Sequence, residues 1–87
     1  MTAPATVQVR YFASLREALG PGEALEAGDA LTVGELRERL AQRGGCHAEV
    51  LAAGRLVRCA LDQRMVDDRE PLADGAEVAF FPPVTGG

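Results

Sequence analysis

The segment Glu77-Val78-Ala79-Phe80-Phe81, followed by Pro82-Pro83-Val84-Thr85-Gly86-Gly87, decides how this chain of 87 residues is organised. Residues 77–81 alternate between two faces and end in aromatic side chains, which predicts a strand with one buried face. The prolines cannot donate sheet hydrogen bonds, and the glycines add no side chain to a core. We therefore expect a folded domain over residues 1–81 and an extended tail over residues 82–87, which at roughly 3.3 Å per residue reaches on the order of 20 Å.

The beginning of the chain predicts another strand and a short helix. Residues 7–11 alternate apolar and polar side chains, the period of two that is typical of a half-buried strand. The apolar positions within residues 12–19 then fall on one helical face. Ser14 and Glu17 have the spacing of a capping box, and the Gly-Pro-Gly sequence at 20–22 predicts the end of this helix.

The main helix is predicted to begin at Thr32. Thr32 and Glu35 form a second capping box, and apolar side chains at helical spacing continue until Gly44-Gly45 ends the helix. Residues 23–27 before it predict a weak strand that forms a hairpin with the first strand. Residues 47–53 after it predict a connector of one or two helical turns.

The second half of the chain completes a small sheet. Residues 57–61 predict a third strand, residues 62–64 a turn, and Met65-Val66 a short fourth strand. The first and last strands contain the most β-prone side chains and are expected to be neighbours in the centre. The prediction is an α+β roll in which a mixed sheet of four to five strands covers one main helix. This arrangement resembles the β-grasp, or ubiquitin-like, fold.

Composition excludes some classes of function. The formal net charge is −4, and nine arginines are interspersed with thirteen acidic residues, so nucleic acid is a poor partner. The chain contains no lysine, which excludes lysine-linked chains of this protein. No run of eighteen apolar residues and no secretory signal is present, so we expect a cytoplasmic protein without a membrane partner.

The metal-binding and nucleophilic residues form no recognisable site. Cys46 and Cys59 are thirteen residues apart and lack the four-ligand pattern of structural zinc, so no metal is expected. They are interpreted as buried small side chains or free thiols. His47 has no nearby partner set for catalysis and is expected in a loop.

Two stretches together resemble one family. Residues 9–17, Val-Arg-Tyr-Phe-Ala-Ser-Leu-Arg-Glu, and the closing run 74–87 are similar to the small subunits of molybdopterin synthase. The Phe-Phe-Pro-Pro-Val-Thr-Gly-Gly sequence is the specific part, because a bare terminal Gly-Gly is shared by many ubiquitin-like proteins. Two positions depart from the family pattern: Asp62 replaces a usual asparagine, and Ala76 replaces a frequent aspartate.

The resemblance implies a sulfur carrier that is not an enzyme by itself. An ATP-dependent, E1-like enzyme is expected to adenylate the Gly87 carboxylate, and a donor such as a cysteine desulfurase or rhodanese then supplies the sulfur of a thiocarboxylate. No stably bound cofactor is implied, because the activating enzyme uses the ATP. The tail, with Gly86 beside Gly87, is expected to enter the large synthase subunit, where the sulfur attacks the cyclic pyranopterin precursor. The family implies a heterotetramer of two carriers and two large subunits.

Partner contacts are expected where the tail begins. Phe80 and Phe81 point to opposite faces of the last strand, so one fills the core and the other is exposed unless a partner covers it. By the family pattern Phe81 is the interface anchor, whereas Phe12 either extends the same patch or packs in the core. The tail residues expected to continue the contact are Pro82, Pro83, Val84 and Thr85. Three arginines either form polar rim contacts or are simply solvated: Arg16, Arg58 and Arg64.

Two other functions stay open, because the tail chemistry is shared. The chain is alternatively a sulfur carrier for tRNA thiolation or thiamine synthesis, although the Phe-Phe-Pro-Pro sequence is not typical of thiamine carriers. A third reading is a ubiquitin-like modifier that attaches Gly87 to lysines of other proteins.

Overall fold

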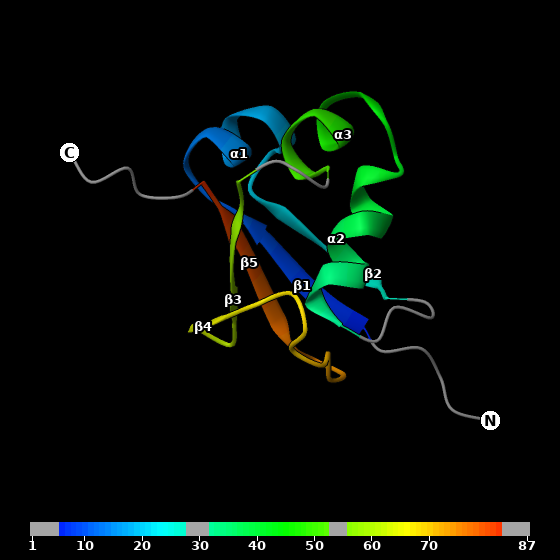
Figure 1. The fold of residues 1–87 in the computed structure, drawn as a ribbon, viewed down its shortest axis with the longest axis vertical. Coiled ribbons are helices and arrows are strands. Elements are labelled where there is room, and N and C mark those ends of the chain that lie inside the picture. Colours follow the sequence, from blue (N-terminus) through cyan, green and yellow to red (C-terminus); the bar gives the residue numbers. More distant parts are fainter. Residues whose placement is uncertain (1–5, 28–31, 53–55, 83–87) are drawn as a thin grey trace.

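A computed structural model describes residues 6–27, 32–52 and 56–82 of the chain (Figure 1). Tail residues 83–87, expected to be extended, lie outside these ranges. In chain order the elements are β1 (Thr6–Tyr11), α1 (Ala13–Leu19), β2 (Gly22–Glu26), α2 (Val33–Ala41), α3 (Gly45–Leu51), β3 (Arg58–Leu61), β4 (Arg64–Val66) and β5 (Glu77–Phe81).

The strands form one mixed sheet in the order β2-β1-β5-β3-β4. β1 and β5 are parallel neighbours in its centre, with Tyr11 opposite Phe80, and the other three pairs are antiparallel. A parallel pair needs a crossover connection, which contains the helices here. The predicted α+β arrangement, with the first and last strands adjacent under a main helix, is confirmed.

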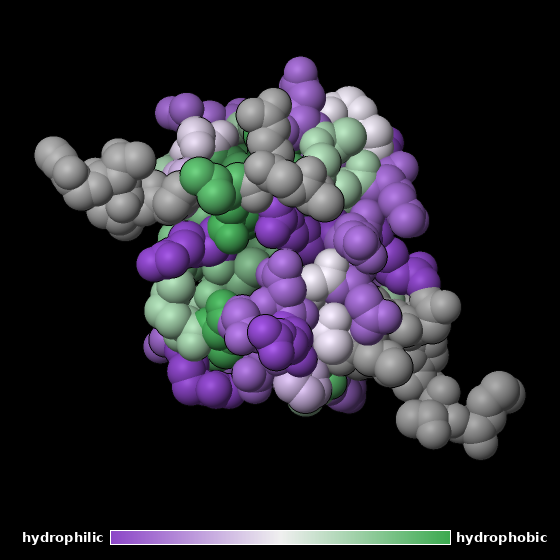
Figure 2. Space-filling view, in the orientation of Figure 1, coloured by the Kyte–Doolittle hydropathy of each residue, from purple (hydrophilic) through white to green (hydrophobic). Residues whose placement is uncertain are grey.

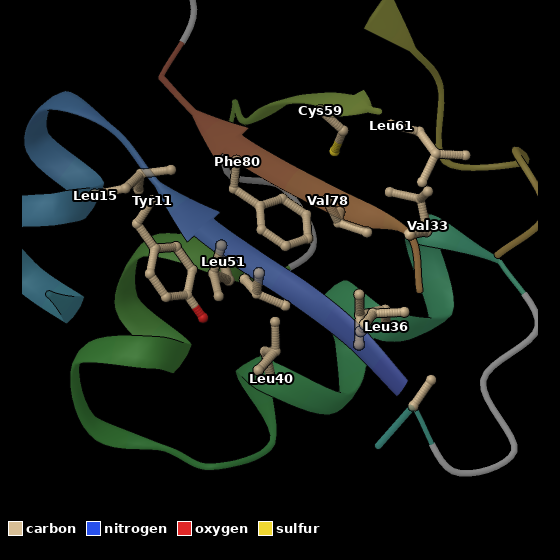
Figure 3. Packing of buried hydrophobic residues seen from close by; sticks show 14 residues of the cluster. Tyr11, Leu15, Val33, Leu36, Leu40, Leu51, Cys59, Leu61, Val78 and Phe80 are labelled. Carbon is tan, nitrogen blue, oxygen red and sulfur yellow. The ribbon is translucent and has the colours of Figure 1, made fainter. Parts of the chain in front are cut away.

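The helices pack on one face of the sheet and form the core with it. Side chains from β1 and β5 point toward α2 and α3 (Figure 3). The aromatic rings of Tyr11 and Phe80 stack there, with centroids 6.2 Å apart and an interplanar angle of 23°. Burial of each large apolar side chain contributes about 1.5–3 kcal/mol. The largest fully buried side chains are Tyr11, Phe80, Leu36, Leu40, Leu51, Val7, Val9, Val33 and Val78.

Helix α1 does not begin with the predicted capping box. Its N-cap residue is Phe12, which makes no side-chain cap hydrogen bond, and Ser14 lies inside the helix. The Phe12 amide instead donates to the Phe80 carbonyl of β5 at 3.1 Å. Ala13 then turns the chain with a φ of 54°. The Ser14–Glu17 prediction is wrong because a tertiary hydrogen bond, rather than a local cap, sets the start of α1.

Helix α2 begins as predicted. Its cap residue Thr32 accepts a hydrogen bond from the Glu35 amide at 3.2 Å through Oγ1. Further along α2, the buried Arg37 donates from Nε to the Leu51 carbonyl at 2.8 Å and from Nη2 to the Ala52 carbonyl at 3.0 Å. Arg37 therefore satisfies carbonyl groups at the end of α3, which have no partner within that helix.

His47 lies in helix α3 rather than in the expected loop. Its ring meets the ring of Tyr11 edge-on, with centroids 6.4 Å apart. Leu51 of the same helix is fully buried in the core. Because this anchor holds the segment against the sheet, residues 45–51 form a packed helix and the predicted connector is part of the core.

The turn between β3 and β4 is tighter than predicted. Leu61 lies opposite Arg64, so only Asp62 and Gln63 form the connection. Both have positive φ, 49° and 70°, as in a type I′ hairpin. Arg64, predicted as part of the turn, belongs to β4.

The helices of this fold are short. The longest, α2, has nine residues, whereas a helix that crosses a bilayer needs about 20. Within the described ranges, no helix has the length and apolar character of a membrane span.

Candidate functional site

The last strand, β5, ends at the same edge of the sheet as its central neighbour β1. β1 and β5 are parallel, so their carboxyl ends meet at the same edge. Phe12 follows Tyr11 there, and its amide donates a hydrogen bond to the Phe80 carbonyl. Phe81 follows Phe80 on the neighbouring strand. Pro82, the last described residue, is partly buried. The fold therefore brings the predicted contacts Phe12, Phe81 and Pro82 to one place.

The two phenylalanines of β5 differ in burial, as predicted. Phe80 is fully buried in the core, whereas Phe81 is partly buried. For Phe12 the sequence left two alternatives, and its 45% exposure shows that it is not a core residue. Aromatic side chains that stay accessible to solvent are typical of protein interfaces. The base of the tail is therefore a candidate docking surface.

This surface extends over the face of the sheet that is turned away from the core, which we call the open face. Alternate strand residues lie on it: Arg10, Arg58, Ala60, Met65, Ala79 and Phe81. Ala60 lies opposite both Met65 and Ala79 and is buried without belonging to the core cluster. Figure 2 shows hydrophobic side chains between charged ones on the side that carries β3 and β4.

Met65 is a candidate contact that the sequence interpretation missed. It is 55% exposed, whereas its neighbour Val66 packs against the core. The available signal was the period of two in the short fourth strand, which places one of these two apolar side chains on the outside. Met65 is flexible and suits an adaptable contact surface.

The arginines near the open face differ in their partners. Arg10 Nε donates to Glu77 Oε2 at 2.9 Å, and Arg64 Nη2 to Glu70 Oε2 at 3.2 Å. Arg64 therefore has a partner within the domain. Arg58 and Arg16 make no ion pair with any described residue. Their predicted role as rim contacts stays a prediction.

The tail residues themselves lie outside the described residues. This applies to five of the predicted site residues: Pro83, Val84, Thr85, Gly86 and Gly87. Their roles stay predictions.

No group of three or more His, Cys, Asp or Glu side chains within the described part of the molecule could hold a metal ion. Both cysteines are free thiols: Cys46 is exposed and Cys59 is buried. Burial, with a smaller effect of Asp68, raises the pKa of the Cys59 thiol to about 11, so it is a poor nucleophile at neutral pH.

The model of the ThiS family matches residues 9–87, which include both the open face and the tail. The chain belongs to the ThiS family. Over 81 residues it is 43% identical to the molybdopterin synthase sulfur carrier subunit of Escherichia coli, covering 93% of this chain and 99% of that relative. The predicted resemblance to small synthase subunits is confirmed.

Solved structures agree with this membership in the ThiS family. The putative molybdopterin converting factor subunit 1 of Pyrococcus furiosus superposes with a TM-score of 0.75 at 30% identity, covering 92% of this chain and 99% of that one. A chain from the complex of subunits 1 and 2 of the Helicobacter pylori molybdopterin-converting factor has a TM-score of 0.66 at 30% identity, covering 94% and 99%. The predicted β-grasp fold is thereby confirmed.

Proposed function

We propose that this chain is the sulfur carrier subunit of a molybdopterin synthase and that Gly87 is the residue that carries the sulfur. The observation that carries the proposal is the similarity, over nearly its whole length, to the Escherichia coli sulfur carrier subunit. The geometry agrees with it, because the exposed Phe12 and the partly buried Phe81 lie at the edge of the sheet where β5 ends.

The chemistry takes place at the carboxylate of Gly87. A carboxylate is a poor electrophile, so an ATP-dependent activating enzyme first joins it to AMP and releases pyrophosphate. A persulfide sulfur of the donor displaces AMP, and a further thiol reduces the resulting acyl disulfide to release the thiocarboxylate. Gly86 and Gly87 suit these steps, because the absence of Cβ atoms leaves the carbonyl uncrowded and the tail narrow.

The large synthase subunit is the partner that receives this tail. In its active site the thiocarboxylate sulfur attacks the cyclic pyranopterin precursor, and water then cleaves the bond between this sulfur and the Gly87 carbonyl, which restores the carboxylate. Two carriers supply the two sulfurs of the dithiolene. The partner supplies the catalytic side chains, whereas this chain contributes the docking surface and the sulfur. Two carriers and two large subunits form a heterotetramer. The free thiols Cys46 and Cys59 support a reducing compartment, the cytoplasm, as its location.

Intact-mass measurement tests the proposal. The chain is incubated with the activating enzyme, ATP, a cysteine desulfurase and cysteine. We expect its mass to rise by the difference between sulfur and oxygen, and to return when the large subunit and the precursor are added. The matched controls omit ATP or use a chain that lacks Gly87. An unchanged mass in the presence of an activating enzyme that works on another carrier would overturn the proposal.

The same tail chemistry would serve tRNA thiolation, thiamine synthesis or protein modification. Affinity capture with the thiocarboxylated chain separates these alternatives from the proposal. Recovery of a thiazole synthase or a tRNA thiolase in place of the large synthase subunit would favour another sulfur pathway. Lysines with a Gly-Gly remnant in whole-cell digests would favour the modifier.

A further inference from the structure

Arg58 stands at the junction between the open face and the tail. It is the first residue of β3, is exposed, and lies opposite Phe81 in the antiparallel pairing of β3 with β5. Side chains directly opposite each other share one face and have Cβ atoms about 4.5–5.5 Å apart. The side chain of Arg58 therefore projects from the same face of the sheet as the ring of Phe81. Phe81 is the residue immediately before the tail.

An open groove of about 730 Å³ adjoins this position along β3 and β4. Arg58 and Met65 line it together with the loop of residues 67–70. Because Met65 also belongs to the open face, the groove and the open face form one continuous surface. A partner that packs on both Phe81 and Met65 therefore also covers Arg58.

Each carboxylate that lines this groove lies beside a group other than Arg58. Asp67 Oδ1 accepts from the backbone amide of Arg69 at 2.8 Å. Asp68 Oδ2 lies 3.9 Å from the buried guanidinium of Arg37, and its Oδ1 faces the Cys59 thiol at 3.9 Å. Glu70 pairs with Arg64 at 3.2 Å. Arg58 is thus left without an ion pair among the described residues, on a chain whose net charge is −4.

We propose that Arg58 binds a carboxylate of the large synthase subunit and thereby orients the open face while Phe81 packs into the same interface. This inference rests on the proposed function and names a specificity-determining residue for it. The planar guanidinium binds a carboxylate through two parallel hydrogen bonds, which fixes direction as well as distance. A second point of attachment beside the aromatic anchor sets the angle at which the tail enters the partner.

Titration of the large subunit with carrier variants tests the proposal. We expect Arg58→Ala to weaken binding by about 3- to 10-fold and Arg58→Glu by more than about tenfold, because the variant repels the partner carboxylate. Arg58→Lys keeps the charge but loses the paired geometry, so its affinity is intermediate. The wild-type affinity falls with added salt, and this dependence is weaker for Arg58→Ala. The matched control is Arg43→Ala, whose arginine is paired with Glu23 outside the groove and which stays within about twofold of wild type.

Measuring the thiocarboxylation of the same variants distinguishes failure of this inference from failure of the proposed function. Arg58→Glu should be activated at the wild-type rate, because its change affects docking on the large subunit alone. If the wild-type chain does not bind the large subunit, the proposed function fails. If wild type binds and Arg58→Glu binds equally well, only the inference is overturned. Loss of activation with unchanged docking also overturns it, since the carboxylate then belongs to the activating enzyme.

Discussion

Two hydrogen bonds join Asp62 and Glu77. The Asp62 amide donates to the Glu77 carbonyl at 2.8 Å, and the Glu77 amide donates to Asp62 Oδ1 at 2.9 Å. Asp62 occupies the turn between β3 and β4 with a φ of 49°, a conformation that Asp and Asn tolerate better than most residues. The turn therefore fixes the first residue of β5, the strand that leads to the tail.

We predict that Asp62→Ala lowers the free energy of unfolding by about 1–3 kcal/mol, because the Glu77 amide loses its acceptor and alanine is strained at this φ. Urea denaturation measures the change. Asp62→Asn keeps both an acceptor oxygen and the tolerance of positive φ, so it should stay within about 0.5 kcal/mol of wild type. Equal losses in both variants would contradict this explanation.

Substitutions of Phe80 and Phe81 distinguish an effect on stability from an effect on partner binding. Phe80→Ala removes a fully buried ring and should cost about 3–5 kcal/mol of unfolding free energy. Phe81→Ala should leave stability within about 1 kcal/mol of wild type and weaken binding of the large subunit by about 1–3 kcal/mol. Thermal denaturation and calorimetric titration measure the two quantities. If Phe81→Ala binds as tightly as wild type, Phe81 is not an anchor.

The period of two in residues 7–11 and 77–81 predicted the central strands, because alternate burial on a sheet leaves a clear pattern in sequence. The same pattern identified Phe80 and Phe81 as residues of opposite faces. Thr32 and Glu35 predicted the start of α2 because a capping box is a local interaction. These features depend only on residues that are close together in the chain.

The wrong predictions concern segments whose structure depends on contacts between residues that are far apart in the sequence. Ser14 has the right spacing for a cap, but the bond from the Phe12 amide to the Phe80 carbonyl starts α1 earlier. His47 lies in a helix because Leu51 anchors that helix in the core. Arg58 has no ion pair among the described residues because three neighbouring carboxylates lie beside other groups, which no sequence pattern shows.

The two cysteines should differ in reactivity. Cys46 is exposed, whereas Cys59 is buried and its pKa is raised to about 11. At pH 8 the thiolate fraction of Cys59 is on the order of 10⁻³. We predict that iodoacetamide at this pH labels the folded protein at Cys46 and labels both cysteines in urea. Peptide mapping by mass spectrometry locates the label. Equal labelling rates in the folded protein would show that Cys59 is accessible.

Tyr11 makes the stability of the fold sensitive to alkaline pH. Its hydroxyl is buried and has no hydrogen-bond partner among the described residues. Burial is the main cause that raises the pKa of Tyr11 to about 12, the nearby Glu23 carboxylate raises it further, and Arg43 opposes the shift. Because the unfolded chain ionises near pH 10, the stability contribution of the neutral hydroxyl is complete below that pH. It is lost as the pH rises from about 10 to about 12.

Tyr11 is the only tyrosine of the chain, so tyrosinate absorbance reports on it alone. We predict that this absorbance appears in the folded protein only as the pH approaches about 12, and that the midpoint of urea denaturation falls over the same range. Tyr11→Phe keeps the stacked ring and should retain most of the stability at pH 7, because no described residue forms a hydrogen bond with the lost hydroxyl. Its stability should then fall less between pH 10 and 12, and the remaining decrease includes the ionisation of Cys59. A tyrosinate midpoint near pH 10 in the folded chain would mean that water reaches the Tyr11 hydroxyl, and the core between β1 and α3 would be more open than the structure shows.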